Sequence, residues 1–110
     1  LTWNRLYALL AEAAGVSAEL VHVPSDLIAM YDRRIGDSLL GDKTHSAIFD
    51  NSKIKQVVPD FVATKPFSTG AREIIAWHQA NPANRKIDPA FDAMCDRMIE
   101  NYRKAWPAKP

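Results

Sequence analysis

The sequence has one cysteine and four glycines among 110 residues, and this scarcity excludes several kinds of site. Cys95 has no second cysteine to pair with, so the chain has no internal disulfide and a reducing, cytoplasmic compartment is the simpler expectation. The glycines, Gly15, Gly36, Gly41 and Gly70, lie far apart. The chain therefore lacks the Gly-rich turn that lets the phosphates of a dinucleotide approach a helix N-terminus.

The chain also lacks an excess of either charge. Its formal net charge is +1, from 14 basic and 13 acidic side chains that are scattered along the sequence. This balance gives no electrostatic reason to expect nucleic acid or an anionic membrane as a partner. No apolar run approaches the length of a membrane span.

Metal-binding patterns are absent as well. His22, His45 and His78 are widely separated, and neither His-x-x-x-His nor Cys-x-x-Cys spacing accompanies them. We therefore expect no metal site.

What is present is ordinary globular material, with 47% hydrophobic and 25% charged residues. At this length we expect one domain over residues 1–110 with a core of its own and a frayed tail at 107–110. The start Leu1-Thr2-Trp3 has no initiating Met and enters a helical pattern almost at once. It suggests a beginning inside a longer protein.

Helical periodicity dominates the chain. Thr2 is a plausible N-cap for a helix that ends at Gly15, and Asp88 with the proline that follows it is the clearest helix start. Further helices are expected after Pro24, over residues 51–58 with Asp50 as the cap, and after Ser68 as the cap.

Other segments lack this period. Leu20, Val21 and Val23 give one short strand candidate, and residues 47–49 give another. Residues 36–46 contain two glycines and two aspartates without a helical period, so an irregular loop is expected there. The fold class is accordingly mainly α with a few short β-strands (α+β).

The last expected helix carries an apolar stripe that admits two interpretations. Its members share one helical face: Phe91, Cys95, Met98, Tyr102 and Trp106. The stripe is either core or the exposed surface of a stand-alone helical module that binds a protein partner.

One region resembles a known enzyme family. Its residues run Phe49-Asp50-Asn51-Ser52-Lys53, then Val58-Pro59-Asp60-Phe61, then Pro66-Phe67 leading to Gly70, Arg72, Ile75 and Trp77. This order resembles the C-terminal lobe of the extended short-chain dehydrogenase/reductases, the NAD-dependent epimerase/dehydratase family. In that lobe an Asp-x-Ser-Lys helix is followed by a Pro-bearing loop and a Gly-x-Arg…Trp helix.

The resemblance implies a small substrate-binding lobe of a Rossmann-type enzyme. The parent protein would act as an oxidoreductase, an isomerase that epimerises, or a dehydratase, with NAD or NADP held by a Rossmann domain that this chain lacks. The family's catalytic Tyr-x-x-x-Lys pair is missing too, because neither Tyr7, Tyr31 nor Tyr102 has a lysine four residues later. We therefore expect no catalytic residue, no cofactor site and no catalysis from this chain alone.

Candidate substrate-binding residues lie in and before the expected loop. Lys43, Thr44 and His45 bring a cation and two hydrogen-bonding groups together where an anionic substrate could bind, although a solvated loop is the alternative. Arg33 and Arg34 could approach from the preceding segment.

The remaining candidates follow from the resemblance. It places Asp50, Asn51, Ser52 and Lys53 beside the substrate cleft, where their first role is helix capping. Many family members bind a sugar nucleotide through an arginine about ten residues before this aspartate. Here Leu40 and Gly41 occupy that region.

Four kinds of partner follow from these interpretations. The chain would contact its own Rossmann domain and a small-molecule substrate in the enzyme, or a protein in the case of a stand-alone module. A lobe separated from its cofactor domain would also expose apolar surface and could associate with itself.

Overall fold

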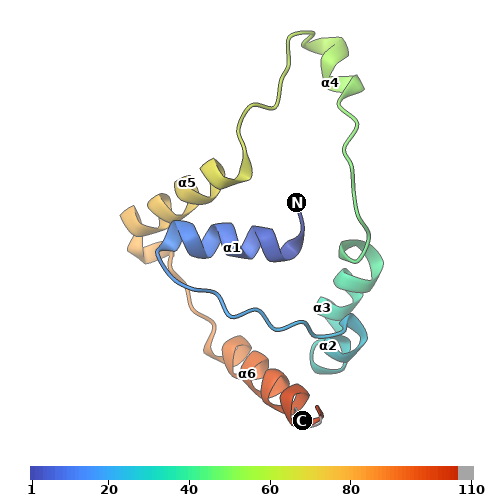
Figure 1. Cartoon of the computed structure of the whole chain (residues 1–110), viewed down its shortest axis with the longest axis vertical. Helices are drawn as coiled ribbons and strands as arrows, with labels where there is room; N and C mark the ends of the chain where they lie inside the picture. Colours follow the sequence, from blue (N-terminus) through green and yellow to red (C-terminus); the bar gives the residue numbers. More distant parts are fainter. Residues whose placement is uncertain (107–110) are drawn as a thin grey trace. The chain divides into compact units, whose positions relative to one another are not determined.

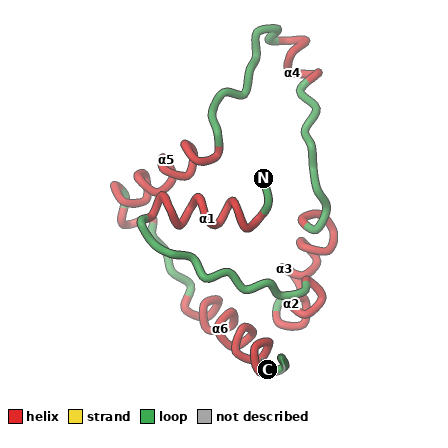
Figure 2. The backbone as a smooth tube through the Cα atoms, viewed as in Figure 1, coloured by secondary structure: helices red, strands yellow, loops and turns green. Residues whose placement is uncertain are grey.

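A computed structural model describes residues 1–106 and contains helices and loops (Figure 2). The frayed tail expected at 107–110 lies outside the described residues. The elements in chain order are α1 (Trp3–Ala14), α2 (Ser25–Tyr31), α3 (Arg33–Ser38), the π-helix η1 (Leu39–Lys43), α4 (Ser52–Val57), α5 (Phe67–Ala80), the 3₁₀-helix η2 (Pro82–Asn84) and α6 (Pro89–Lys104).

The prediction of short β-strands is wrong for the part of the chain that the structure describes. Residues 20–23 and 47–49 both lie outside any helix or strand. A strand forms only when its N–H and C=O groups pair with a neighbouring strand, and β-branched composition alone supplies no such neighbour. The fold class of residues 1–106 is mainly α without strands.

The described chain divides into two compact units, whose α-helices are labelled in Figure 1. The first comprises Leu1–Leu20 and Phe49–Lys86, and the second comprises Val21–Ile48 and the chain from Ile87 onward. Neither unit has a large core. The buried hydrophobic residues of 1–106 are Leu9 and Ala71 in the first unit and Met98 in the second.

In the first unit α1 packs on α5. The Thr2 hydroxyl accepts a hydrogen bond from the Arg5 amide at 3.3 Å, and Gly15 adopts the left-handed conformation (φ 72°) that ends α1. These two caps confirm the predicted helix. Leu9 on α1 and Ala71 on α5 are the buried side chains of this helix pair.

Helix α5 begins two residues earlier than predicted, because a cap at Ser68 would make Thr69 its first residue. Phe67 is its first residue and Pro66 precedes it without a side-chain cap, so the prediction of Ser68 as the N-cap is wrong. At the other end the Arg85 guanidinium donates to the carbonyls of His78 and Gln79, at 2.9 and 3.1 Å. Those hydrogen bonds satisfy carbonyl groups that a helix end leaves free.

In the second unit, the region expected to be an irregular loop is largely helical. The Asp32 carboxylate accepts from the Ile35 amide at 3.0 Å and caps α3, which continues directly into η1. Gly36 is buried where α3 packs on α2, with Ala29 directly beside it. The prediction was wrong because glycine and aspartate lower helix propensity, whereas here the absence of a side chain at Gly36 permits close helix packing.

Helix α6 confirms the prediction at Asp88, whose carboxylate accepts from the Ala90 and Phe91 amides, both at 3.1 Å. The residues of the apolar stripe differ in how far they are buried. Met98 is buried, Cys95 and Tyr102 are half-buried, and Phe91 near the start of the helix is exposed. Trp106 is also exposed and lies beyond the end of α6 at Lys104.

A side-chain hydrogen bond also links α6 to α2. The Asn101 amide group donates to the Tyr31 hydroxyl at 3.0 Å. Together with the buried Met98, this contact indicates that the middle of the α6 stripe belongs to the core of the second unit.

Candidate functional site

A pocket of about 340 Å³ lies along α3 and η1 in the second unit. Its lining residues come from one continuous stretch of helix: Arg34, Ile35, Ser38, Leu39 and Lys43. Two of the residues predicted to bind substrate, Arg34 and Lys43, are thus brought to the same pocket by the helical conformation of residues 33–43. If this segment were an irregular loop, nothing in the backbone would hold Arg34 and Lys43, which are nine positions apart, at one pocket.

The cations near this pocket differ in how far they are neutralised. Arg33 Nε lies 3.5 Å from an Asp37 carboxylate oxygen, and Lys43 Nζ lies 3.4 Å from an Asp42 carboxylate oxygen. The Arg34 guanidinium has no ion-pair partner within residues 1–106. The pocket therefore has one uncompensated positive charge, and Arg34 carries it.

Apolar side chains form the rest of the lining. Ile35 and Leu39 are half-buried and lie four residues apart, so they neighbour each other along the helix surface. Ser38 adds a hydroxyl that can donate or accept a hydrogen bond. The pocket thus combines one guanidinium and one ammonium group with an apolar wall.

The other predicted substrate-binding residues do not line this pocket. Thr44 and His45 follow η1 and are exposed, and Arg33 is exposed and paired with Asp37. Sequence reasoning missed Ser38 and Leu39 because residues 36–46 were expected to be irregular, and Ile35, directly before them, was assigned to no helix face. The available signal was the i, i+4 spacing of Ile35 and Leu39, which is typical of a helix.

The residues predicted to position a cleft form a helix start in the first unit. One Asp50 carboxylate oxygen accepts from the Ser52 amide at 2.9 Å and from the Ser52 hydroxyl at 2.6 Å, directly before α4. Asn51 lies between them, and Lys53 is an exposed residue in the first turn. The helix begins one residue later than predicted, at Ser52 with Asn51 in the N-cap position, so the prediction of Asp50 as the N-cap is wrong, although its carboxylate does hold the first residue of α4.

These hydrogen bonds have an electrostatic consequence. The Ser52 hydroxyl, and then the Ser52 amide, lower the pKa of Asp50 from its ordinary value of 3.8 because both favour the charged carboxylate. The charged Asp50 carboxylate therefore stabilises this helix start fully at a pH above its ordinary pKa. The stabilisation is lost as the pH falls through the lowered pKa of Asp50 in the folded chain.

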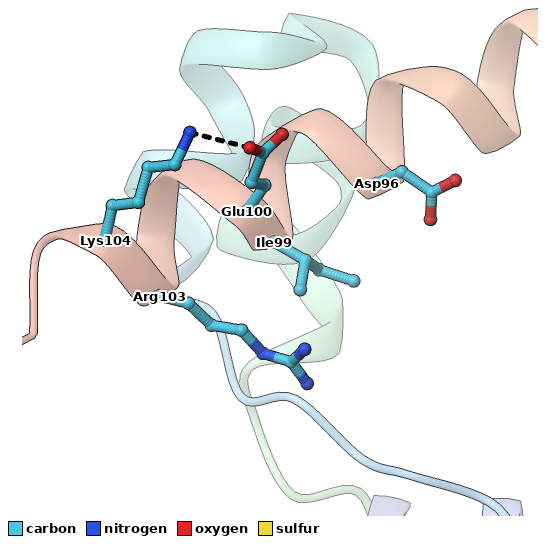
Figure 3. A pocket seen from close by; sticks show the side chains of 5 residues that line it. All are labelled: Asp96, Ile99, Glu100, Arg103 and Lys104. Atoms are coloured by element: carbon cyan, nitrogen blue, oxygen red, sulfur yellow. Dashed lines mark hydrogen bonds and ion pairs between the residues drawn. The ribbon is translucent and has the colours of Figure 1, made fainter.

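A second and larger hollow, of about 440 Å³, lies on a single face of α6. Figure 3 shows its five side chains projecting from that one helix: Asp96, Ile99, Glu100, Arg103 and Lys104. The two acidic and two basic groups balance, and Lys104 Nζ already lies 2.6 Å from a Glu100 carboxylate oxygen (Figure 3). The hollow has no net charge to attract an ion, so we favour the pocket on α3 and η1 as the site.

Cys95 has the surroundings of a packing residue. Burial raises the pKa of its thiol, and the nearby Asp92 and Asp96 raise it further. Less thiolate, the reactive form, is then present at neutral pH. Residues 1–106 hold no cluster of three or more metal-ligating side chains, and no helix among them is long and apolar enough to span a membrane.

Comparisons with known proteins found no relative of this chain. No protein-family model, no curated protein and no solved structure matches the chain.

Proposed function

We propose that this chain is the substrate-binding lobe of an NAD(P)-dependent enzyme of the epimerase/dehydratase type. In this proposal a Rossmann domain supplies NAD or NADP and the catalytic residues. The lobe supplies the α3–η1 pocket and helps to exclude water from the substrate, which contributes through orientation and desolvation without a reacting group. The parent would catalyse oxidoreduction at a hydroxyl-bearing carbon, or an epimerisation or dehydration that passes through a ketone.

The observation that carries this proposal is the exposed apolar surface of the first unit. Trp3, Tyr7 and Trp77 on the α1–α5 pair are each more than half exposed. An aromatic side chain has about 150–250 Å² of surface that can be removed from water. Because about half of each of the three side chains is exposed, roughly 300 Å² in total is left for a partner to cover. At about 25 cal/mol per Å², burial of this area would stabilise a complex by roughly 7 kcal/mol. A stabilisation of that size favours a partner that covers the surface.

The segment around α4 adds to this surface. Phe49, Val57 and Val62 are 87%, 76% and 69% exposed, and α4 packs on no other helix of the described residues. A cofactor domain that adjoins this segment would cover these side chains. The segment is also the part of the sequence with the Asp-x-Ser-Lys pattern.

The competing proposal, a stand-alone module that binds a protein through α6, has less support. Its stripe is centred on Met98, which is buried, and on Tyr102, which is half-buried. These two side chains are packed inside the second unit, so they are not available to bind a partner protein. Self-association through the exposed surface of the first unit remains compatible with the main proposal, because the same surface would be free in a lobe without its cofactor domain.

The setting we propose is cytoplasmic, since the only cysteine, Cys95, cannot form an internal disulfide.

The proposal predicts where the cofactor binds. NADH and NADPH would each be titrated, with fluorescence detection, into the purified product of the native gene and in parallel into residues 1–110. We expect saturable binding of at least one cofactor by the native product and none by residues 1–110. A native product that binds neither cofactor would refute the proposal.

A further inference from the structure

We infer that the α3–η1 pocket binds a carboxylate attached to a hydrocarbon body, with Arg34 as the principal carboxylate ligand. This names the ligand class of the substrate lobe and so rests on the proposed function for its cellular meaning. The binding itself depends only on residues of this chain.

The charge of the pocket favours a monoanion. Asp42 lies 3.4 Å from Lys43 and offsets its charge, which leaves the single unpaired charge of Arg34. A ligand with one negative charge matches this site. A diphosphate brings two or more charges, so Asp42, whose carboxylate adjoins the pocket residue Lys43, would repel it about twice as strongly as a monoanion at the same distance.

The chemistry of the two cations supports the same choice. The planar guanidinium of Arg34 can donate two parallel hydrogen bonds to one carboxylate. The Lys43 ammonium group has three donors, so it can contribute to the same anion while it stays near Asp42. Ser38 lies between them in the sequence and offers one further donor at the pocket wall.

The apolar wall requires the ligand to have an apolar part. Ile35 and Leu39 line the same pocket as Arg34 and Lys43, so a ligand held by its carboxylate would place the adjoining carbons against these two side chains. Each methylene that leaves water contributes about 0.8 kcal/mol. The volume of about 340 Å³ is at the small end for ligand pockets, which fits a short chain or a single ring better than a sugar nucleotide.

The test uses residues 1–110 and octanoate as the probe, followed by NMR of the Ile35 and Leu39 methyl groups. The parallel probes are 1-octanol, which lacks the charge, acetate, which lacks the chain, and inorganic phosphate. We expect octanoate to shift both methyl signals with a Kd on the order of 1 mM. Octanol and acetate should each bind at least about tenfold more weakly, because each forfeits one of the two contributions.

Matched arginine variants decide whether the contact is specific. Arg34→Gln should weaken octanoate binding about tenfold, which corresponds to the loss of one charge-assisted contact. Arg33→Gln is the control, because Arg33 is the next residue, is paired with Asp37 and does not line the pocket. It should leave the affinity within about twofold of the parent chain.

Three results would overturn the inference: equal losses in the two variants, tighter binding of phosphate than of octanoate, or no methyl shift with octanoate. These results are separate from those of the cofactor titration. Octanoate binding without cofactor binding by the native product would retain the pocket and reject the enzyme, and the reverse pattern would reject only the pocket assignment.

Discussion

Replacing Gly36 with alanine should destabilise the second unit by about 2 kcal/mol or more. A Cβ atom at this position would overlap both the side chain and the backbone of Ala29 on α2. A flexible side chain could move aside, whereas backbone can yield only if α2 and α3 separate. That separation would also disturb the start of η1 and hence the pocket.

The measurement for Gly36→Ala is urea unfolding followed by far-UV circular dichroism, with Gly70→Ala as the matched control. Gly70 lies in α5 with open space where a Cβ would be, so alanine there should stabilise its helix by about 0.5–1 kcal/mol. The two glycine variants should therefore shift the unfolding midpoint in opposite directions. A Gly36→Ala chain as stable as the parent would mean that α2 and α3 do not approach each other as described.

Replacing Ala71 with glutamate should disrupt the first unit. Ala71 is 0% exposed at the interface of α5 with α1, so the new carboxylate would be buried without a partner. An uncompensated buried charge costs about 3–5 kcal/mol, which exceeds what a helix pair with only two buried side chains can sustain. The expected result is loss of the α1–α5 packing.

Ala76→Glu is the control for this charge, because Ala76 lies on the same helix and is exposed. Its effect should stay within about 0.5 kcal/mol. Near-ultraviolet circular dichroism reports on the packing of Trp3 and Trp77, which belong to these two helices. An unchanged spectrum in Ala71→Glu would show that Ala71 is not at a helix interface.

The local parts of this fold could be predicted from the sequence. The caps at Thr2, Gly15 and Asp88 depend on residues within a few positions of each other, so the sequence contains all of their determinants. Helix α5 shows the limit of such signals. Its first residue is Phe67, since a helix can begin after Pro66 without any side-chain cap.

The parts that depend on distant residues were predicted wrongly. The hydrophobic residues at 20–23 and 47–49 have the composition of strands, but a strand needs a second strand, and the structure provides none there. Residues 36–46 have the composition of a loop, but the packing of Gly36 against Ala29 outweighs low helix propensity.

The candidate site also has one part that the sequence predicted and one part that depends on the fold. The sequence indicated Arg34 and Lys43 as cations near an anionic ligand, because charge can be read directly from residue type. Their common pocket, and the apolar wall of Ile35 and Leu39, depend on the continuous helix from α3 into η1. In the sequence, the i, i+4 spacing of Ile35 and Leu39 is the only sign of that continuity, and the glycines and aspartates of residues 36–46 outweighed it.

The central claim is that a cofactor domain covers the apolar surface of the first unit. Amide hydrogen exchange of residues 1–110 and of the purified native gene product tests it most directly, with α1, α5 and the residues from Phe49 to Val62 as the reporting segments. We predict exchange at least about tenfold slower for these segments in the native product, because covered backbone opens less often. Equal exchange rates in the two proteins would contradict the claim.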